Sequence, residues 1–336
     1  MTDARGREAK TPRQIPWRGL VDVGWRVWRE AFDDKLTIVA AGVAFFGMIA
    51  IFPALIAVVS VYGLLFDPHD VLGQMRDMAP ALPWSARRVV MTQLSEIVQG
   101  SGTQLGFGLV SSLVFTIVGA SSGMHALIDG INHAYDEKET RSWFRVRATA
   151  LGFTMIAIVF VVISIALIAV LPPMLPVHVG SWVSVLRWPA LGGAFILGLS
   201  WLYRHAPNRR PPRWQWVSFG AVFATGAWLL VSWLFSLYAQ SFGRFNHTYG
   251  TLGGAIVLLL WMFLSSLAIL LGAELNAELE HQTEVDTTIG PERPMGERHA
   301  FMADTVGPSA PKRVSRLLVR GGSAWRADSR RARIPP

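Results

Sequence analysis

Six long apolar stretches, separated by polar loops, run through the chain. They are Leu36–Phe66, Leu105–Ile128, Thr149–Leu171, Trp182–Tyr203, Trp216–Tyr238 and Thr251–Gly272. A helix needs roughly 20 residues to cross a hydrocarbon core about 30 Å thick, and each stretch is that long. Because lipid offers no hydrogen bonds, a spanning segment must satisfy its own backbone, which favours helices over open strands. The pattern predicts an all-α fold, a polytopic transmembrane helical bundle of about six spans.

The second apolar stretch changes character towards its end. After Ala120 it becomes small and polar, with the sequence SSGMHALIDG. Hydropathy alone therefore leaves open whether residues 121–134 lie within the membrane.

Amphipathic or polar segments flank the predicted spans. Residues 18–34 place apolar side chains on one helical face and charged ones on the other, which predicts an interfacial helix; the apolar face holds Val21, Trp25, Trp28 and Phe32, and the charged face Asp22, Arg26, Arg29 and Asp33. A similar pattern recurs at residues 85–98. From Gln282 onward Pro, Gly, Arg and Ser dominate with little periodicity, which favours disorder. We therefore divide the chain into an N-terminal segment (1–35), a transmembrane bundle (36–280) and a basic, disordered tail (281–336).

The basic residues alternate between the two sides of the predicted bundle. Of 31 Lys and Arg residues, 26 fall before the first span, in the second and fourth connections and in the tail, and 5 fall in or beside the other connections. Positive loops stay in the cytoplasm, so both termini are expected on the cytoplasmic side of a bacterial plasma (inner) membrane. The net charge of +8 is thus mainly a topology signal. The basic tail is expected to adhere to the anionic inner leaflet, and specific nucleic-acid binding is not expected.

Chemistry-bearing motifs are scarce. The chain has no cysteine, which excludes disulfides, thiolate metal ligands and a cysteine nucleophile. Its eight histidines include no HxH or HxxxH pair and thus no local zinc signature. We expect no catalytic residues, no metal and no cofactor, and hence a protein that is not an enzyme.

Polar residues at the ends of the spans form the candidate site. On the expected cytoplasmic side the set comprises His125, Asp129, Asn132, Arg204, Asn208, Arg209 and Glu274, and at the outer end Asn246 and Tyr249. Polar groups at membrane depth are a functional hint. Our hypothesis is that the inner set converges to accept a phosphate headgroup while the outer pair lines an exit. The alternative is that these residues are ordinary solvated helix ends and positive-inside loops.

Small residues recur at the spacing of closely packed membrane helices. The examples are Gly119-xxx-Gly123, Gly250-xxx-Gly254 and the run Gly192-Gly193-Ala194. Such positions let helices approach closely. They indicate either packing inside one bundle or the contact face of a homo-oligomer.

Several motifs together resemble a known family, the YihY/virulence factor BrkB membrane proteins, long catalogued as ribonuclease BN. The resemblance covers residues 33–280 and rests on the segments AAGVAFF (40–46), Phe52-Pro53, 126–135, YRHAPN (203–208), Trp214, Tyr249-Gly250 and LGAEL (271–275). It implies a cell-envelope protein of the inner membrane, linked to movement of lipid or another amphiphile. A structural protein that recruits envelope partners is the alternative, and a membrane-bound ribonuclease is a remote one.

Overall fold

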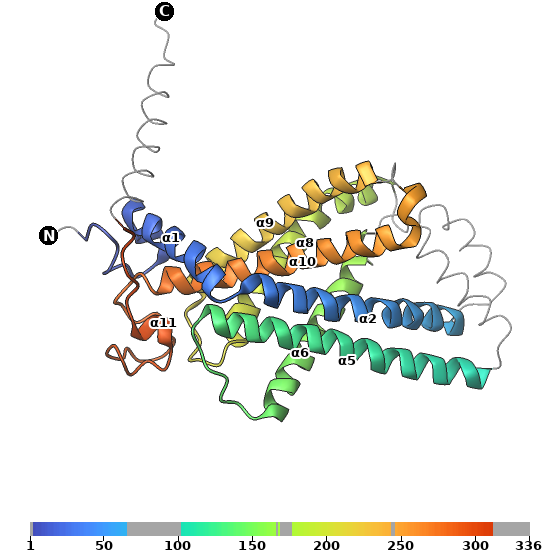
Figure 1. Ribbon diagram of the computed structural model, residues 1–336, viewed down its shortest axis with the longest axis horizontal. Coiled ribbons are helices and arrows are strands. Elements are labelled where there is room, and N and C mark those ends of the chain that lie inside the picture. Colours follow the sequence, from blue (N-terminus) through green and yellow to red (C-terminus); the bar gives the residue numbers. More distant parts are fainter. Residues whose placement is uncertain (1–2, 66–101, 166, 169–176, 243–245, 312–336) are drawn as a thin grey trace, which may run out of the picture.

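The computed structural model describes residues 3–65, 102–165, 167–168, 177–242 and 246–311. Within these ranges every regular element is a helix, apart from one isolated bridge between Pro212 and Thr288 (Figure 1). The helices are η1 (Pro12–Gln14), α1 (Trp17–Asp33), α2 (Leu36–Leu65), α5 (Gly102–Ala134), α6 (Trp143–Ile165), α8 (Val177–His205), α9 (Trp214–Phe242), α10 (Asn246–Glu280) and α11 (Phe301–Asp304). The predicted all-α class is confirmed.

Six of these helices, α2, α5, α6, α8, α9 and α10, are long and apolar enough to cross a membrane. This confirms the predicted spans, although their ends differ from the prediction. The helix α6 begins at Trp143 rather than Thr149, and α10 continues to Glu280 rather than Gly272. Residues 121–134 continue α5 without a break. Large apolar side chains stay exposed along the bundle, among them Leu197 at 66%, as a lipid-facing surface requires.

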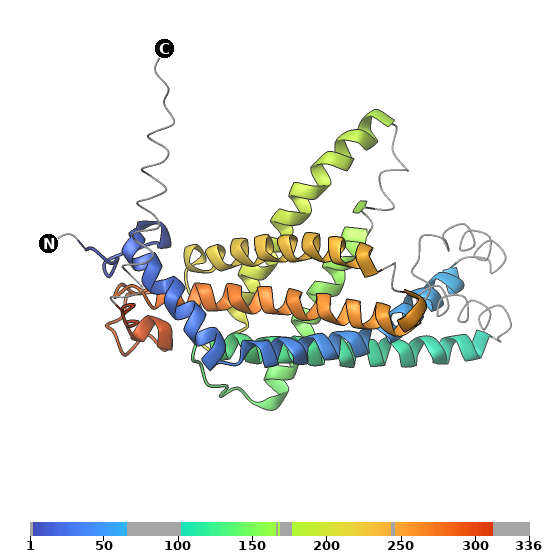
Figure 2. The ribbon, with the colours of Figure 1, turned by 45° about the horizontal axis from the view of Figure 1, so that its top comes forward.

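Four of the spans run side by side, and two lean away from them. Figure 2 shows α2, α5, α9 and α10 roughly parallel, whereas α6 and α8 cross this group at a steep angle. Aromatic rings connect the leaning helices to the rest in a chain from α6 to α10: Phe160–Phe195, Phe195–Trp228 and Trp228–Trp261, with centroids 6.0, 5.2 and 6.4 Å apart. The sparser packing of α6 and α8 leaves room for grooves on their flanks.

Small residues bring the parallel helices into close contact. A Cβ atom on Gly220 of α9 would lie 2.0 Å from the carbonyl oxygen of Gly272 on α10, so only glycine fits there. On α5, a Cβ on Gly119 would lie 3.0 Å from the Cβ of Ala50 on α2. Gly119 therefore packs inside the bundle. By contrast, a Cβ on Gly192 or Gly193 would meet nothing within 4 Å.

One end of the bundle, which we call the capped end, carries α1 and residues 281–311 (Figure 1). Residues 281–311 were expected to be disordered, but here they are packed: Gln282, Thr283 and Thr288 are fully buried. They become ordered because they close over the end of α10 and meet the N-terminal segment, where Glu284 N donates to Arg7 O at 2.7 Å. Residues 312–336 of the predicted tail and the amphipathic pattern at 85–98 lie outside the described residues.

The helix α1 is amphipathic as predicted, but the protein covers two residues of its charged face. Asp22 and Arg26 are buried, at 1% and 0% exposure, whereas Trp28 and Phe32 are exposed. Their burial is possible because the residues that pack against α1 supply partners for both charges. The exposed aromatic face remains suited to a membrane interface.

Candidate functional site

Asn132 and Asn208, two of the predicted site residues, contact each other at the capped end. The side-chain Oδ1 of Asn132 accepts a hydrogen bond from the backbone N–H of Asn208 at 2.8 Å, and its Nδ2 donates to Glu139 at 3.1 Å. The Nδ2 of Asn208 donates to the Lys138 carbonyl at 2.7 Å and to Thr140 Oγ1 at 2.8 Å. The two amides therefore join the α5–α6 loop to the α8–α9 loop, and their hydrogen-bonding groups are largely occupied.

Arg209 forms a buried ion pair with Glu280. The two side chains are 0% and 1% exposed, and Arg209 Nη2 lies 2.6 Å from Glu280 Oε1. The guanidinium also lies over the ring of Tyr135, 4.8 Å from its centroid, and Thr287 donates a short hydrogen bond to Glu280. This charged pair fastens the α8–α9 loop to the end of α10.

Arg204 is occupied differently from Arg209. Its guanidinium lies 4.5 Å from the ring centroid of Trp214, at the start of α9, and two of its nitrogens are buried without a hydrogen-bond partner in the described part of the chain. The cation–π contact joins the end of α8 to the start of α9.

Glu274 is the most isolated polar residue of the predicted set. Its side chain is 0% exposed, and neither carboxylate oxygen has a hydrogen-bond partner among the described residues. The charges that act on it most strongly are four other carboxylates, of Asp34, Glu278, Glu30 and Asp136. An ionised carboxylate in such surroundings is costly unless a counter-ion accompanies it.

The acidic groups near Glu274 at the edge of the bundle respond to the same surroundings. Burial raises the pKa of Asp34, at the junction of α1 and α2, from 3.8 to about 7, and the charges of Asp136 and Glu30 add to this rise. Burial also raises the pKa of Asp136 and of Glu137 above their ordinary values. Acidic side chains therefore gather in this part of the capped end, where burial favours their protonated forms.

His125 and Asp129 lie apart from these groups on the outer side of α5. His125 Nε2 is 3.7 Å from Asp129 Oδ2, and the side chains are 30% and 45% exposed. Residues 119–123 read Gly-x-Ser-x-Gly, a spacing also found around hydrolase nucleophiles, with Ser121 one turn before His125. Here the segment lies within a continuous helix rather than in the strained strand–turn–helix that such a nucleophile needs.

Asn246 and Tyr249 lie in the first turns of α10, at the opposite end from Glu274. Their side chains lie outside the described residues. The predicted residues thus form one joined pair (Asn132 and Asn208), a buried ion pair (Arg209 with Glu280) and separate positions at Arg204, Glu274 and the His125–Asp129 pair.

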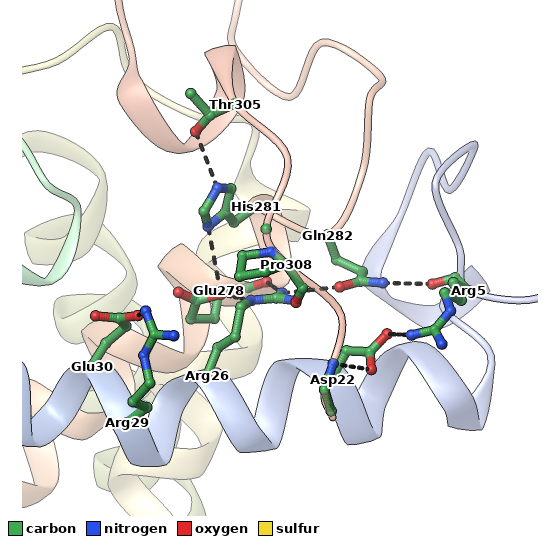
Figure 3. A network of polar contacts seen from close by, with 12 residues as sticks. Arg5, Asp22, Arg26, Arg29, Glu30, Glu278, His281, Gln282, Thr305 and Pro308 are labelled. Carbon is green, nitrogen blue, oxygen red and sulfur yellow. Dashed lines mark hydrogen bonds and ion pairs between the residues drawn. The ribbon is translucent and has the colours of Figure 1, made fainter. Parts of the chain in front are cut away.

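Sequence reasoning missed the most connected polar residue, Arg26 of α1 (Figure 3). Its guanidinium forms a short ion pair with Glu278 and donates to the Glu278 carbonyl at 3.0 Å, to Gln282 Oε1 at 2.9 Å and to the Pro308 carbonyl at 3.0 Å. One turn earlier, Asp22 accepts hydrogen bonds from Arg5 and from the backbone N–H of Ala310. The i, i+4 spacing of Asp22 and Arg26 was the available signal, but the sequence pattern places both residues on the charged face of an interfacial helix.

An apolar cavity opens between the spans α5, α6 and α8, with a volume of about 250 Å³. It reaches inward to Ile269 of α10, and its wall is made of apolar side chains and glycine, including Met124, Leu127, Phe153, Ile156, Phe160, Phe195, Gly198 and Leu199. The ring of Phe153 lies 5.3 Å from that of Trp201 and joins the two leaning helices at this site. Such a wall suits a hydrocarbon chain. Elsewhere, the described residues contain no group of three or more His, Asp or Glu side chains arranged to hold a metal ion.

Comparisons with known proteins agree with this architecture. A family profile described as virulence factor BrkB matches residues 27–296. A protein of Bacillus subtilis (strain 168) named ribonuclease-like protein YfkH is 34% identical over 261 residues, which are 73% of this chain and 90% of that protein. A UPF0761 membrane protein of Tolumonas auensis is 25% identical over 75% of this chain and 83% of its own length. A UPF0761 membrane protein of Xanthomonas oryzae is 26% identical over 77% of this chain, and the match spans 61% of that protein.

No solved structure matches the chain. The family profile nevertheless covers all six spans and part of the capped end. The chain is therefore an integral membrane protein that belongs to the virulence factor BrkB family.

Proposed function

We propose that this protein binds a lipid or another amphiphile and helps to move it in a bacterial inner membrane, without acting as an enzyme. The observation that supports this proposal is the apolar cavity between α5, α6 and α8. Its volume of about 250 Å³ is below the roughly 300–1,000 Å³ typical of pockets that enclose a whole ligand. The cavity thus suits one hydrocarbon chain of an amphiphile whose remainder stays in the bilayer.

The capped end lies in the cytoplasm in this proposal, because 26 of the 31 basic residues belong to that side. The cysteine-free chain is its own background for labelling. Single cysteines at Lys138 and Asn208 should react with an impermeant reagent only after the cells are permeabilised. Single cysteines at Gln93 and His247 should react in intact cells, and the opposite pattern would overturn the orientation.

A larger side chain at a glycine that lines the cavity provides the test of function. Gly198 lines the cavity, and a Cβ there would meet nothing within 4 Å. We expect Gly198→Phe to slow the transbilayer movement of fluorescent phospholipid by the purified protein in liposomes. The matched control is Gly193→Phe, at another open position of α8 outside the cavity.

The two variants give a clear decision. Movement that falls in Gly198→Phe and persists in Gly193→Phe supports the proposal. If wild-type protein moves no lipid above the rate of empty liposomes, the proposal is wrong. A membrane protein that recruits envelope partners would then be the better reading.

A further inference from the structure

A second groove lies on another face of α6, between α6 and α5. Its volume is about 410 Å³, and its lining includes Ile117, Val118, Ser121, Trp143, Arg147 and Leu151. The α6 residues that line it differ from those that line the apolar cavity and fall on the opposite side of the helix. It is therefore a separate site.

Arg147 gives this groove its chemistry. Its guanidinium lies 5.7 Å from the centroid of the Trp143 ring. Unlike Arg26, Arg141 and Arg209, it makes no ion pair with any carboxylate of the described residues. None of the lining residues is acidic. A cation with open hydrogen-bonding sites thus faces a space that holds no protein anion.

The start of α6 reinforces the positive character of the groove. The helix begins at Trp143 and carries no acidic residue in its first turn, so the positive end of its dipole and its first free N–H groups are not offset. An anion is the favoured neighbour here.

The other side chains of the groove specify which kind of anion fits. Trp143 and Phe144 are 65% and 79% exposed at the first turn of a spanning helix, as aromatic residues at the headgroup level of a bilayer are. Below them, Ile117, Val118 and Leu151 supply an apolar floor, and Ser121 adds a hydroxyl. A phosphate above and hydrocarbon below is the profile of a phospholipid rather than a soluble anion.

We propose that the groove between α5 and α6 binds an anionic phospholipid of the leaflet at the capped end, with Arg147 paired to its phosphate. The guanidinium supplies planar, fork-shaped donors that match phosphate oxygens. The net negative charge of the lipid is selected because no carboxylate of the described residues pairs with Arg147 and none lies in the first turn of α6. This site is independent of the proposed cargo cavity.

The test is native mass spectrometry of the purified full chain, titrated with phosphatidylglycerol or with phosphatidylcholine of the same acyl chains. Wild-type protein should retain phosphatidylglycerol preferentially. Losing a charge-assisted contact worth about 1.5–3 kcal/mol predicts that Arg147→Gln weakens this retention by about tenfold or more. Phosphatidylcholine retention should change little.

Arg145→Gln is the matched control, because it removes the same charge two residues away at an exposed position outside the groove. It should keep the preference within about twofold of wild type, since exposed charges contribute little. Arg147→Lys keeps the charge and should retain part of the preference, which separates lipid binding from misfolding. Equal losses in Arg147→Gln and Arg145→Gln, or none in either, would overturn the proposal.

Discussion

Glu274 and Glu278 lie one helical turn apart at the capped end of α10, and both side chains are buried. Glu278 has Arg26 as an ion-pair partner, and His281 lies 3.7 Å away. Glu274 has no hydrogen-bond partner for either oxygen within the described residues. Two glutamates of one helix, buried one turn apart, thus differ in their surroundings. Glu278 is neutralised by an ion pair, whereas Glu274 is isolated.

The difference separates two roles for buried charge. The Arg26–Glu278 pair joins α1 to α10 and orders residues 282 and 308 around it, so its role in assembly is evident. Glu274 joins nothing, and an apolar residue would fill its place at lower cost. An ionisable group at a spanning-helix end without a structural task is a candidate for function, which keeps Glu274 as the strongest member of the predicted site.

The largest expected effect on stability comes from breaking the ion pair between Arg26 and Glu278. Arg26→Ala leaves the Glu278 carboxylate buried without its counter-ion and removes the hydrogen bonds to Gln282 and Pro308, so we expect a loss of about 3–5 kcal/mol in the free energy of unfolding. Arg29→Ala is the control, because Arg29 is 48% exposed in its pair with Glu30; its removal should cost no more than about 1 kcal/mol. Unfolding in detergent measures both free energies, and equal losses would show that Arg26 does not hold α1 to α10.

A smaller effect on stability is expected when Glu274 is replaced. Glu274→Leu removes no hydrogen bond, so the free energy of unfolding should change by no more than about 1 kcal/mol or should rise. Glu278→Leu, by contrast, strands Arg26 and should destabilise the protein strongly. If Glu274 serves lipid movement, Glu274→Gln should slow it in liposomes while the melting temperature is kept. A variant that keeps both full transport and full stability would remove Glu274 from the site.

The smallest expected effect is a pH dependence of stability, which arises from Asp34 near Glu274. Because burial raises the pKa of Asp34 from 3.8 to about 7, the folded protein binds a proton there that the unfolded chain has released. The contribution of Asp34 to stability is therefore greatest below pH 3.8 and is lost as the pH rises through about 7. Partial exposure and solvent screening reduce its size.

Asp34→Asn tests this dependence. The melting temperature of wild type should fall between pH 5 and pH 8, and the fall should be shallower in the variant. Asp136, Glu137 and Glu30 also have raised pKa values, so part of the slope should remain. Parallel curves for the two proteins would show that Asp34 does not titrate in this range.

The spans were predictable from sequence because each apolar run must satisfy its backbone within itself, without help from distant residues. The last turns of α10 were not, because Glu278 and Glu280 are buried only by virtue of Arg26 and Arg209, which lie far away in the chain. For the same reason the amphipathic pattern of α1 showed two faces but not that the protein would cover Asp22 and Arg26. Placing Asn132 and Asn208 at the same end of the bundle was within reach of sequence reasoning, whereas their direct hydrogen bond was not.

The contact between Arg26 and Glu278, 252 residues apart, also sets an order of events during biosynthesis. At 5–20 residues per second, roughly 10–50 s separate the synthesis of these two residues. Throughout that interval α1 has emerged from the ribosome while its partner helix does not yet exist, and Arg26 has only water and lipid headgroups to bind. The cap can close only after the sixth span has been made and inserted. A chain that stops short of Glu278 keeps an uncovered α1, which distinguishes an incomplete protein from a finished one.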